Sequence, residues 1–141
     1  MLQRIQSLYL FVGAALTALF FFFPEVAREW PSAVHWSGPI VLGVLGGILV
    51  IGGFGSIFLY GDRSLQKKVV NGLQWVTVLF VLVLYGSLWQ GDLLRPLFGG
   101  VINIVQVVAL CIPIVVYVNF YLARRNIQKD IELVESMDRL R

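Results

Sequence analysis

The stretch LARRNIQKDIELVESMDRLR, residues 122–141, is the longest polar segment of the chain, and it follows directly from an apolar run. At 100° per residue, its apolar side chains gather on one half of a helical wheel. The members of this apolar arc are Ile127, Ile131, Leu133, Val134, Met137 and Leu140. The pattern predicts an amphipathic C-terminal helix built to meet a partner.

Three charged residues, Asp130, Asp138 and Arg141, lie inside the apolar arc. One interpretation is that Asp138 pairs with Arg141, one turn further along. The alternative is that these charges meet partners when the arc docks. The basic and acidic side chains of the segment nearly balance, so attraction to anionic lipid alone would hold the segment only weakly. A helix that faces protein is the better fit.

The composition of the 141-residue chain is that of a protein that crosses a membrane several times. It is 58% hydrophobic and 13% charged, with a mean hydropathy of +0.82, and its length fits one domain. The net charge is +3, but the basic residues stand at the ends of apolar runs, which argues against nucleic acid as a partner. The single cysteine, Cys111, excludes an intramolecular disulfide and a CxxC redox pair.

Four apolar runs predict an all-α membrane protein, a bundle of four transmembrane helices. Each run is about 20 residues long and lacks Asp, Glu, Lys, Arg and His, so it can cross a hydrocarbon core of about 30 Å. The runs cover about residues 5–23, 39–60, 73–90 and 100–123. We therefore expect a four-span bundle over residues 1–123 and a cytoplasmic amphipathic helix over 124–141. A secretory signal is the competing interpretation of the first run.

Basic residues are distributed unequally between the two sides of the predicted membrane. Arg28 and Arg95 lie on one side. The other side carries Arg4, Arg63, Lys67, Lys68, Arg124, Arg125, Lys129, Arg139 and Arg141. Because loops rich in Lys and Arg stay in the cytoplasm, both termini are predicted to be cytoplasmic, in the inner membrane of a bacterium.

The second run is rich in glycine. Gly43 and Gly47 form a GxxxG pair, and Gly52 with Ser56 continues the small-residue spacing. Such spacing lets two helix backbones approach closely in lipid. We expect this face to pack against a neighbouring helix, although general tolerance of glycine in membrane helices remains the alternative.

The fourth run contains a polar stripe. Its members, spaced along one helical face, are Asn103, Gln106, Leu110, Pro113 and Tyr117. Asn103 and Gln106 fit hydrogen bonds between helices, and the alternative is that the stripe, with Tyr117, lines a small cavity or a quinone-like pocket. Pro113 is expected to kink the helix and to free a carbonyl near Ala109.

Residues for catalysis or metal binding are sparse. No span carries an ionisable side chain of the kind that ion-coupled transporters use. His35 is the only histidine, so a bis-histidine haem is excluded, and a zinc site would need further ligands. No nucleophile-elbow or phosphate-loop motif occurs. We therefore expect no enzyme activity, no cofactor and no metal.

Three segments resemble a small bacterial membrane family, the domain of unknown function family 4293. They are the opening MLQRIQSLYL (1–10), the loop FLYGDRSLQKK (58–68) and the closing KDIELVESMDRLR (129–141). The matching residues are Gln3, Arg4 and Gln6, then Arg63, Leu65 and Gln66, then Lys129, Asp130, Leu133, Val134, Ser136, Asp138, Arg139, Leu140 and Arg141. Gly61, Ile131 and Glu135 depart from the pattern. The resemblance covers the whole chain and implies a four-span architecture and a membrane location, but no activity.

The sequence thus predicts a non-enzymatic inner-membrane protein, a docking or accessory subunit that engages a protein partner through its cytoplasmic loop and C-terminal helix. The candidate docking residues are Arg63, Lys67, Lys129, Asp130, Asp138, Arg139 and Arg141. We also expect the tail to fold back on the loop, with Arg63 or Lys67 meeting Asp130 or Asp138. The alternative is a small-molecule, lipid or quinone-handling protein. Expected partners are membrane lipids, a protein or larger membrane complex, and further copies of the chain.

Overall fold

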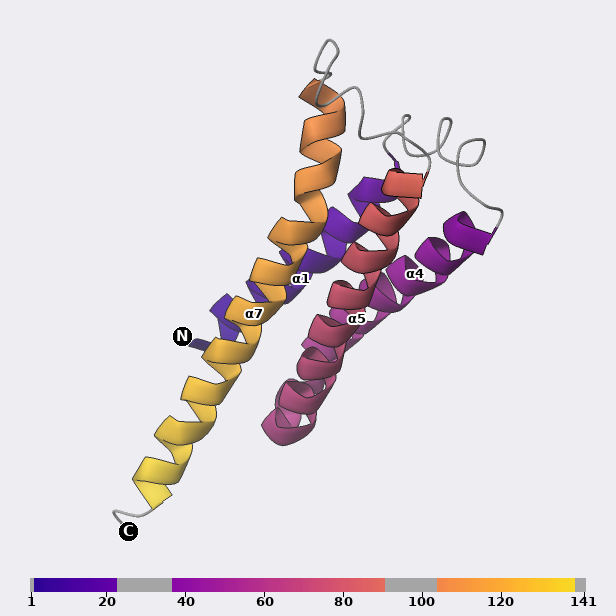
Figure 1. Cartoon of the computed structure of the whole chain (residues 1–141). Helices are drawn as coiled ribbons and strands as arrows, with labels where there is room; N and C mark the ends of the chain where they lie inside the picture. Colours follow the sequence, from indigo (N-terminus) through magenta and orange to yellow (C-terminus); the bar gives the residue numbers. More distant parts are fainter. Residues whose placement is uncertain (1, 23–36, 91–103, 139–141) are drawn as a thin grey trace.

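The computed structural model describes residues 2–22, 37–90 and 104–138, and within them every regular element is helical. Four α-helices form a bundle (Figure 1). They are α1 (Leu2–Phe21), α4 (Ser37–Phe58), α5 (Arg63–Gln90) and α7 (Ile104–Asp138), and a short 3-10 turn, η1 (Leu59–Gly61), joins α4 to α5. The four-helix fold class is thereby confirmed.

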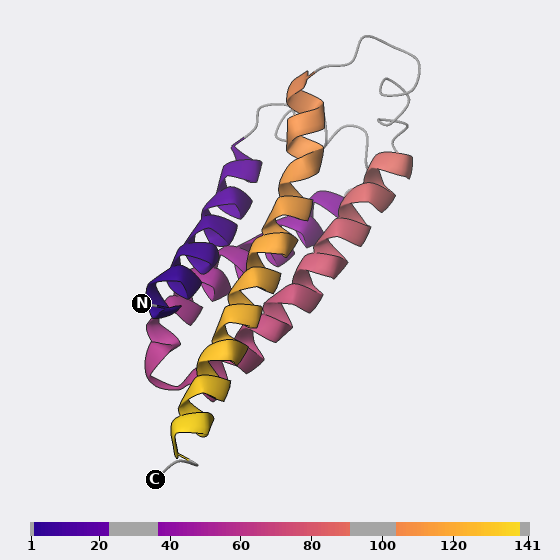
Figure 2. The same cartoon turned by 90° about the vertical axis from the view of Figure 1, so that its left-hand side faces the viewer.

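Each helix of the bundle has two principal neighbours. Helix α1 packs against α4 and α7, and α5 packs against the same two helices. Successive helices run in opposite directions, and the last turns of α7 project past the corner between α4 and α5 (Figure 2). The end of the bundle where α1 begins and α4 ends is called the polar end below, because its interhelical contacts are polar.

Helix α5 begins at Arg63, well before the apolar run predicted to start at 73. The Asp62 side chain explains this early start. Its Oδ1 accepts the Leu65 N–H at 3.0 Å and the Ser64 hydroxyl at 2.8 Å, which caps the first turn. The same two hydrogen bonds, chiefly that from Leu65, hold the pKa of Asp62 below its ordinary value of 3.8. The predicted loop over residues 61–72 is therefore mostly helix.

Helix α7 runs without a break from the fourth apolar run into the polar tail, and it contains Pro113 in its interior. A proline removes one intrahelical hydrogen bond and crowds the preceding turn. Near this point the Leu110 carbonyl accepts the Tyr85 hydroxyl of α5 at 2.9 Å. Tyr85 thus supplies an external donor beside the position where the sequence predicted an exposed carbonyl.

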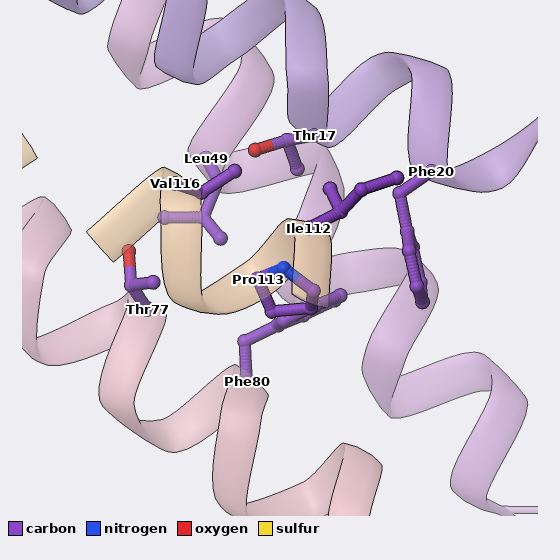
Figure 3. Close-up of a pocket in the computed structure, with 8 residues that line it drawn as sticks. All are labelled: Thr17, Phe20, Leu49, Thr77, Phe80, Ile112, Pro113 and Val116. Atoms are coloured by element: carbon purple, nitrogen blue, oxygen red, sulfur yellow. The ribbon is translucent and has the colours of Figure 1, made fainter. Parts of the chain in front are cut away.

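Three aromatic rings pack together in the apolar core. Phe20 packs edge-to-face on Phe21 and Phe80, with centroid separations of 5.5 and 5.7 Å. A narrow gap beside them is lined by Thr17, Phe20, Leu49, Thr77, Phe80, Ile112, Pro113 and Val116 (Figure 3). Its walls meet so closely that no space for a water molecule remains. This region is packing rather than a ligand cavity, and is called the aromatic end below.

Two of the helices are long and apolar enough to cross a membrane, over Ile40–Phe58 and Arg63–Trp89. A third, Ile5–Phe21, is a shorter apolar helix. The described apolar part of α7 ends just before Arg124, which shortens the stretch of this helix that could lie in a membrane. Large apolar side chains such as Leu19, Ile51 and Leu82 point outward on the bundle.

Candidate functional site

Two buried glutamines join helices at the polar end. Gln66 of α5 donates from Nε2 to the Ser56 carbonyl of α4 at 3.0 Å. Gln6 of α1 donates from Nε2 to the Asn126 carbonyl of α7 at 3.2 Å. Both glutamines are almost fully buried. Since a buried amide without a partner is costly, these bonds fix which helices meet at this end.

An ion pair ties the tail of α7 to the start of α5. Arg63 Nε lies 3.0 Å from Asp130 Oδ2, with the two side chains 31% and 13% exposed. Asp130 Oδ2 is buried and accepts no hydrogen bond from the described residues, so the contact is one of charge rather than of a linear N–H···O bond. The structure thus contains the contact between Arg63 and a tail carboxylate that the sequence suggested. The side chain of Asp138, the other candidate, lies outside the described residues.

A second cation of α7 is held against α5. Arg124 Nη1 donates to Gln74 Oε1 at 3.0 Å. Gln74 is buried, whereas Arg124 is exposed. The Arg124 guanidinium is therefore oriented by a buried acceptor, and it has further donors besides the one that Gln74 binds.

The other candidate docking residues have separate surroundings. Lys67 is half-buried on α5 and Lys129 is exposed on α7. Arg139 and Arg141 lie outside the described residues. Among the described candidates, the structure therefore pairs Arg63 with Asp130 and leaves Lys67 and Lys129 outside this pair.

The apolar arc of the tail changes its environment along α7. Ile127 is fully buried in the bundle, and Ile131 and Val134 are half-buried. Leu133 and Met137, one turn apart, are 49% and 63% exposed. The bundle thus covers the first part of the arc, while the projecting turns carry apolar side chains that no described residue covers.

Only some members of the predicted polar stripe lie in the described part of the chain. Asn103 and the side chain of Gln106 lie outside it. Pro113 is buried, but Tyr117 is exposed. The reason is that the buried arc of α7 runs through Val116 and Phe120, and a residue next to Val116 is turned by 100°. Tyr117 therefore lies on the outer surface.

The predicted packing by Gly43 and Gly47 is wrong within the described chain, since a Cβ at either position would meet nothing within 4 Å. Gly52 does pack closely, because a Cβ there would lie 2.6 Å from Leu73 Cδ2. Ser56 is buried and its hydroxyl donates to the Gly53 carbonyl at 2.8 Å.

Two further close helix contacts involve glycines outside the predicted spacing. A Cβ at Gly53 would lie 2.9 Å from the Ala14 Cβ of α1. A Cβ at Gly46 would overlap the Phe21 ring. The face of α4 that turns into the bundle is therefore rotated by about one residue, or 100°, from the face that Gly43 and Gly47 indicated.

Metal-ligating side chains do not gather in groups of three or more among the described residues. Cys111 is a free, exposed thiol on α7. His35 lies outside the described residues.

Sequence reasoning missed Gln74 and identified Gln6 and Gln66 only through the family resemblance. The positions of Gln66 and Gln74 on their helix could have indicated that they make contacts between helices. Gln66 and Gln74 share the helical face of the buried Val70 and Thr77, where a polar residue needs a partner from another helix.

Comparison with known proteins gives one match. Neither the curated proteins nor the solved structures contain a significant match to the chain. The sequence model of a family described as a domain of unknown function, DUF4293, matches residues 2–140. This match spans essentially the whole chain and agrees with the resemblance carried by its opening, loop and closing segments. The chain belongs to the DUF4293 family.

Proposed function

We propose that the protein is a four-span inner-membrane protein of bacteria whose cytoplasmic end docks another protein. The distribution of side chains supports insertion, because the exposed positions along α1, α4 and α5 are mostly apolar, with Ser64 and Lys68 at the start of α5 as exceptions, while buried positions include Gln6, Gln66 and Gln74. Polar groups inside and apolar groups outside suit a protein with lipid as its solvent. The excess of Lys and Arg at the polar end favours a cytoplasmic placement of that end.

The observation that carries the docking function is the exposed pair Leu133 and Met137 on the projecting turns of α7. These turns lie past the polar residues Arg124 and Arg125, so in the proposed orientation they stand in water rather than in lipid. Apolar side chains spaced four residues apart on such a helix are typical anchors for a partner's groove. The role is non-enzymatic, as a docking or accessory subunit.

The ion pair refines the docking surface. Arg63 and Asp130 already pair with each other, so they are assigned to holding α7 in place rather than to binding the partner. Lys129, which is exposed one turn before Leu133, is a charged residue available at its rim. The rival small-molecule function is less favoured, because Tyr117 is exposed and the gap beside Pro113 has no space for a water molecule.

Site-specific photo-crosslinking in cells tests the docking function. A photoreactive residue is placed singly at Leu133 and Met137, with matched controls at Glu132 and Glu135, which lie at least 100° away on the same turns. We expect one protein to be captured at both test positions and at neither control. The absence of an adduct at Leu133 and Met137, or equal capture at all four positions, would contradict the proposal.

A further inference from the structure

The register between α5 and α7 is fixed by two hydrogen bonds. Gln74 meets Arg124, and Tyr85 meets the Leu110 carbonyl. Because the two helices are antiparallel with the same rise per residue, positions between and beyond these contacts can be matched. Trp75 then lies level with Tyr121, and Gly72 lies level with Arg125. Lys68 follows one turn further toward the polar end.

The outer surface of this helix pair changes character over a short distance. Trp75 and Tyr121 are 69% and 48% exposed and form an aromatic layer. On one side of the layer the exposed residues are apolar, beginning with Leu79 and Val118. On the other side they include the cations Lys68, Arg124 and Arg125. Aromatic rings between apolar and cationic positions are typical of the boundary between hydrocarbon and headgroups.

The cationic part of the surface is open and locally unbalanced in charge. A Cβ at Gly72 would meet nothing within 4 Å, so the stripe from Lys68 to Trp75 has a notch at its centre. Gln74 Oε1 orients the Arg124 guanidinium beside it. Asp62 interacts with Lys68, so the unbalanced charge is that of Arg124 and Arg125. Of the described acids on α7, Asp130 pairs with Arg63, and Glu132 and Glu135 lie two turns or more from Arg125, where Glu132 accepts from Gln128 at 2.7 Å.

We propose that this surface binds the phosphate headgroup of an anionic phospholipid from the cytoplasmic leaflet. The seam that would hold it consists of Lys68, Gly72, Trp75, Tyr121, Arg124 and Arg125. Arg124 and Arg125 offer planar forks of donors that match phosphate oxygens, and Lys68 adds a point charge. The acyl chains lie along Leu79 and Val118 beyond the aromatic layer. A basic site between transmembrane helices on the cytoplasmic side has the chemistry that recognises such lipids.

The inference rests on the proposed membrane placement but not on the protein partner. It also differs from attraction of the whole tail to the membrane, since the charges of the tail nearly cancel. The seam lies at the base of the tail, on the side of α7 away from the ion pair with Arg63.

Native mass spectrometry of the full chain in mild detergent tests the lipid site. Phosphatidylglycerol and phosphatidylethanolamine with identical acyl chains are titrated separately. We expect one phosphatidylglycerol molecule to bind at least about tenfold more tightly than phosphatidylethanolamine. Arg125→Gln should weaken phosphatidylglycerol binding about fivefold, as expected for one cation at the membrane surface, and Arg125→Lys should retain most of the affinity.

The charge-matched control is Arg63→Gln, which removes one cation that Asp130 already neutralises. It should change phosphatidylglycerol affinity by less than about twofold, whereas Arg125→Gln should not. Equal losses in the two variants would mean that only net charge matters and would overturn the site. Equal affinity for the two lipids would also overturn it, as would complete displacement by millimolar inorganic phosphate, which would indicate a site for free phosphate. Capture of a protein at Leu133 and Met137 is a separate readout, so failure of either proposal can be recognised.

Discussion

At the polar end of the bundle, Gln6, Gln66 and the Arg63–Asp130 pair join the helices through directional or charged contacts, whereas at the aromatic end Phe20, Phe21 and Phe80 join them through ring packing. Ring packing resists the creation of a cavity but accepts small changes in direction. Buried amides contribute less energy each, yet they select particular partners because an unpaired amide is costly. We therefore expect stability to depend most on the aromatic end and the position of the tail to depend on the polar end.

The largest effect is expected from Phe20→Ala at the aromatic end. Removal of a fully enclosed ring that contacts two others should lower the free energy of unfolding by about 3 kcal/mol. The control is Phe22→Ala, since Phe22 is 83% exposed and should cost little. Reversible unfolding in mixed detergent micelles measures both variants. Similar losses for Phe20 and Phe22 would show that the aromatic end does not dominate stability.

Close packing along α4 is tested by Gly53→Leu against Gly47→Leu. A side chain at Gly53 must displace Ala14 of α1, so we expect a loss of about 1–3 kcal/mol. Gly47 has open space, so its variant should unfold like the wild type in detergent. A loss at Gly47 that appears only in membranes would instead indicate a contact with a second copy of the chain.

The value of a buried amide at the polar end is tested by Gln66→Met. The substitution removes the donor to the Ser56 carbonyl and keeps the length of the side chain, so a loss of about 1 kcal/mol is expected. Gln128→Met is the control, because Gln128 Nε2 donates to the exposed Glu132 of the same helix and Gln128 Oε1 accepts no hydrogen bond from the described residues. Equal stability of the Gln66 and Gln128 variants would remove the basis for treating the two ends differently.

The smallest effect on stability is expected from the Arg63–Asp130 pair. A partly exposed ion pair contributes only about 0–1 kcal/mol because solvent screens it. Arg63→Asp and Asp130→Arg should each speed amide hydrogen exchange in residues 124–138 by up to about fivefold, and the double variant should restore the slower rate. Exchange in the double variant as fast as in the singles would show that this pair does not hold the tail.

Much of the fold could be predicted from the sequence, because the apolar runs and the positions of the charges determine where the helices lie. The runs located all four helices, and the polar tail was recognised as helical. The boundary of α5 was misplaced, since the cap formed by Asp62 and Ser64 depends on a local turn rather than on hydropathy.

The contacts between side chains inside the bundle were harder to predict from the sequence than the helices were. Gly43 and Gly47 have the spacing of a packing motif, yet spacing alone does not say which face of α4 turns inward, and Gly46 and Gly53 occupy that face. Topology did bring Arg63 near the tail carboxylates, because both segments belong to the same side of the bundle. The partner of Gln74 could not be predicted, since it depends on the register between α5 and α7.

The central claim is that four spans place the projecting end of α7 and the start of α1 on the cytoplasmic side. Single cysteines at Ser32 and Ser136, in a Cys111→Ser background because Cys111 is exposed, measure this directly. In intact spheroplasts, a membrane-impermeant thiol reagent should label the cysteine at position 32 and leave the one at position 136 unlabelled until the membrane is broken. Labelling of position 136 in intact spheroplasts would contradict the account.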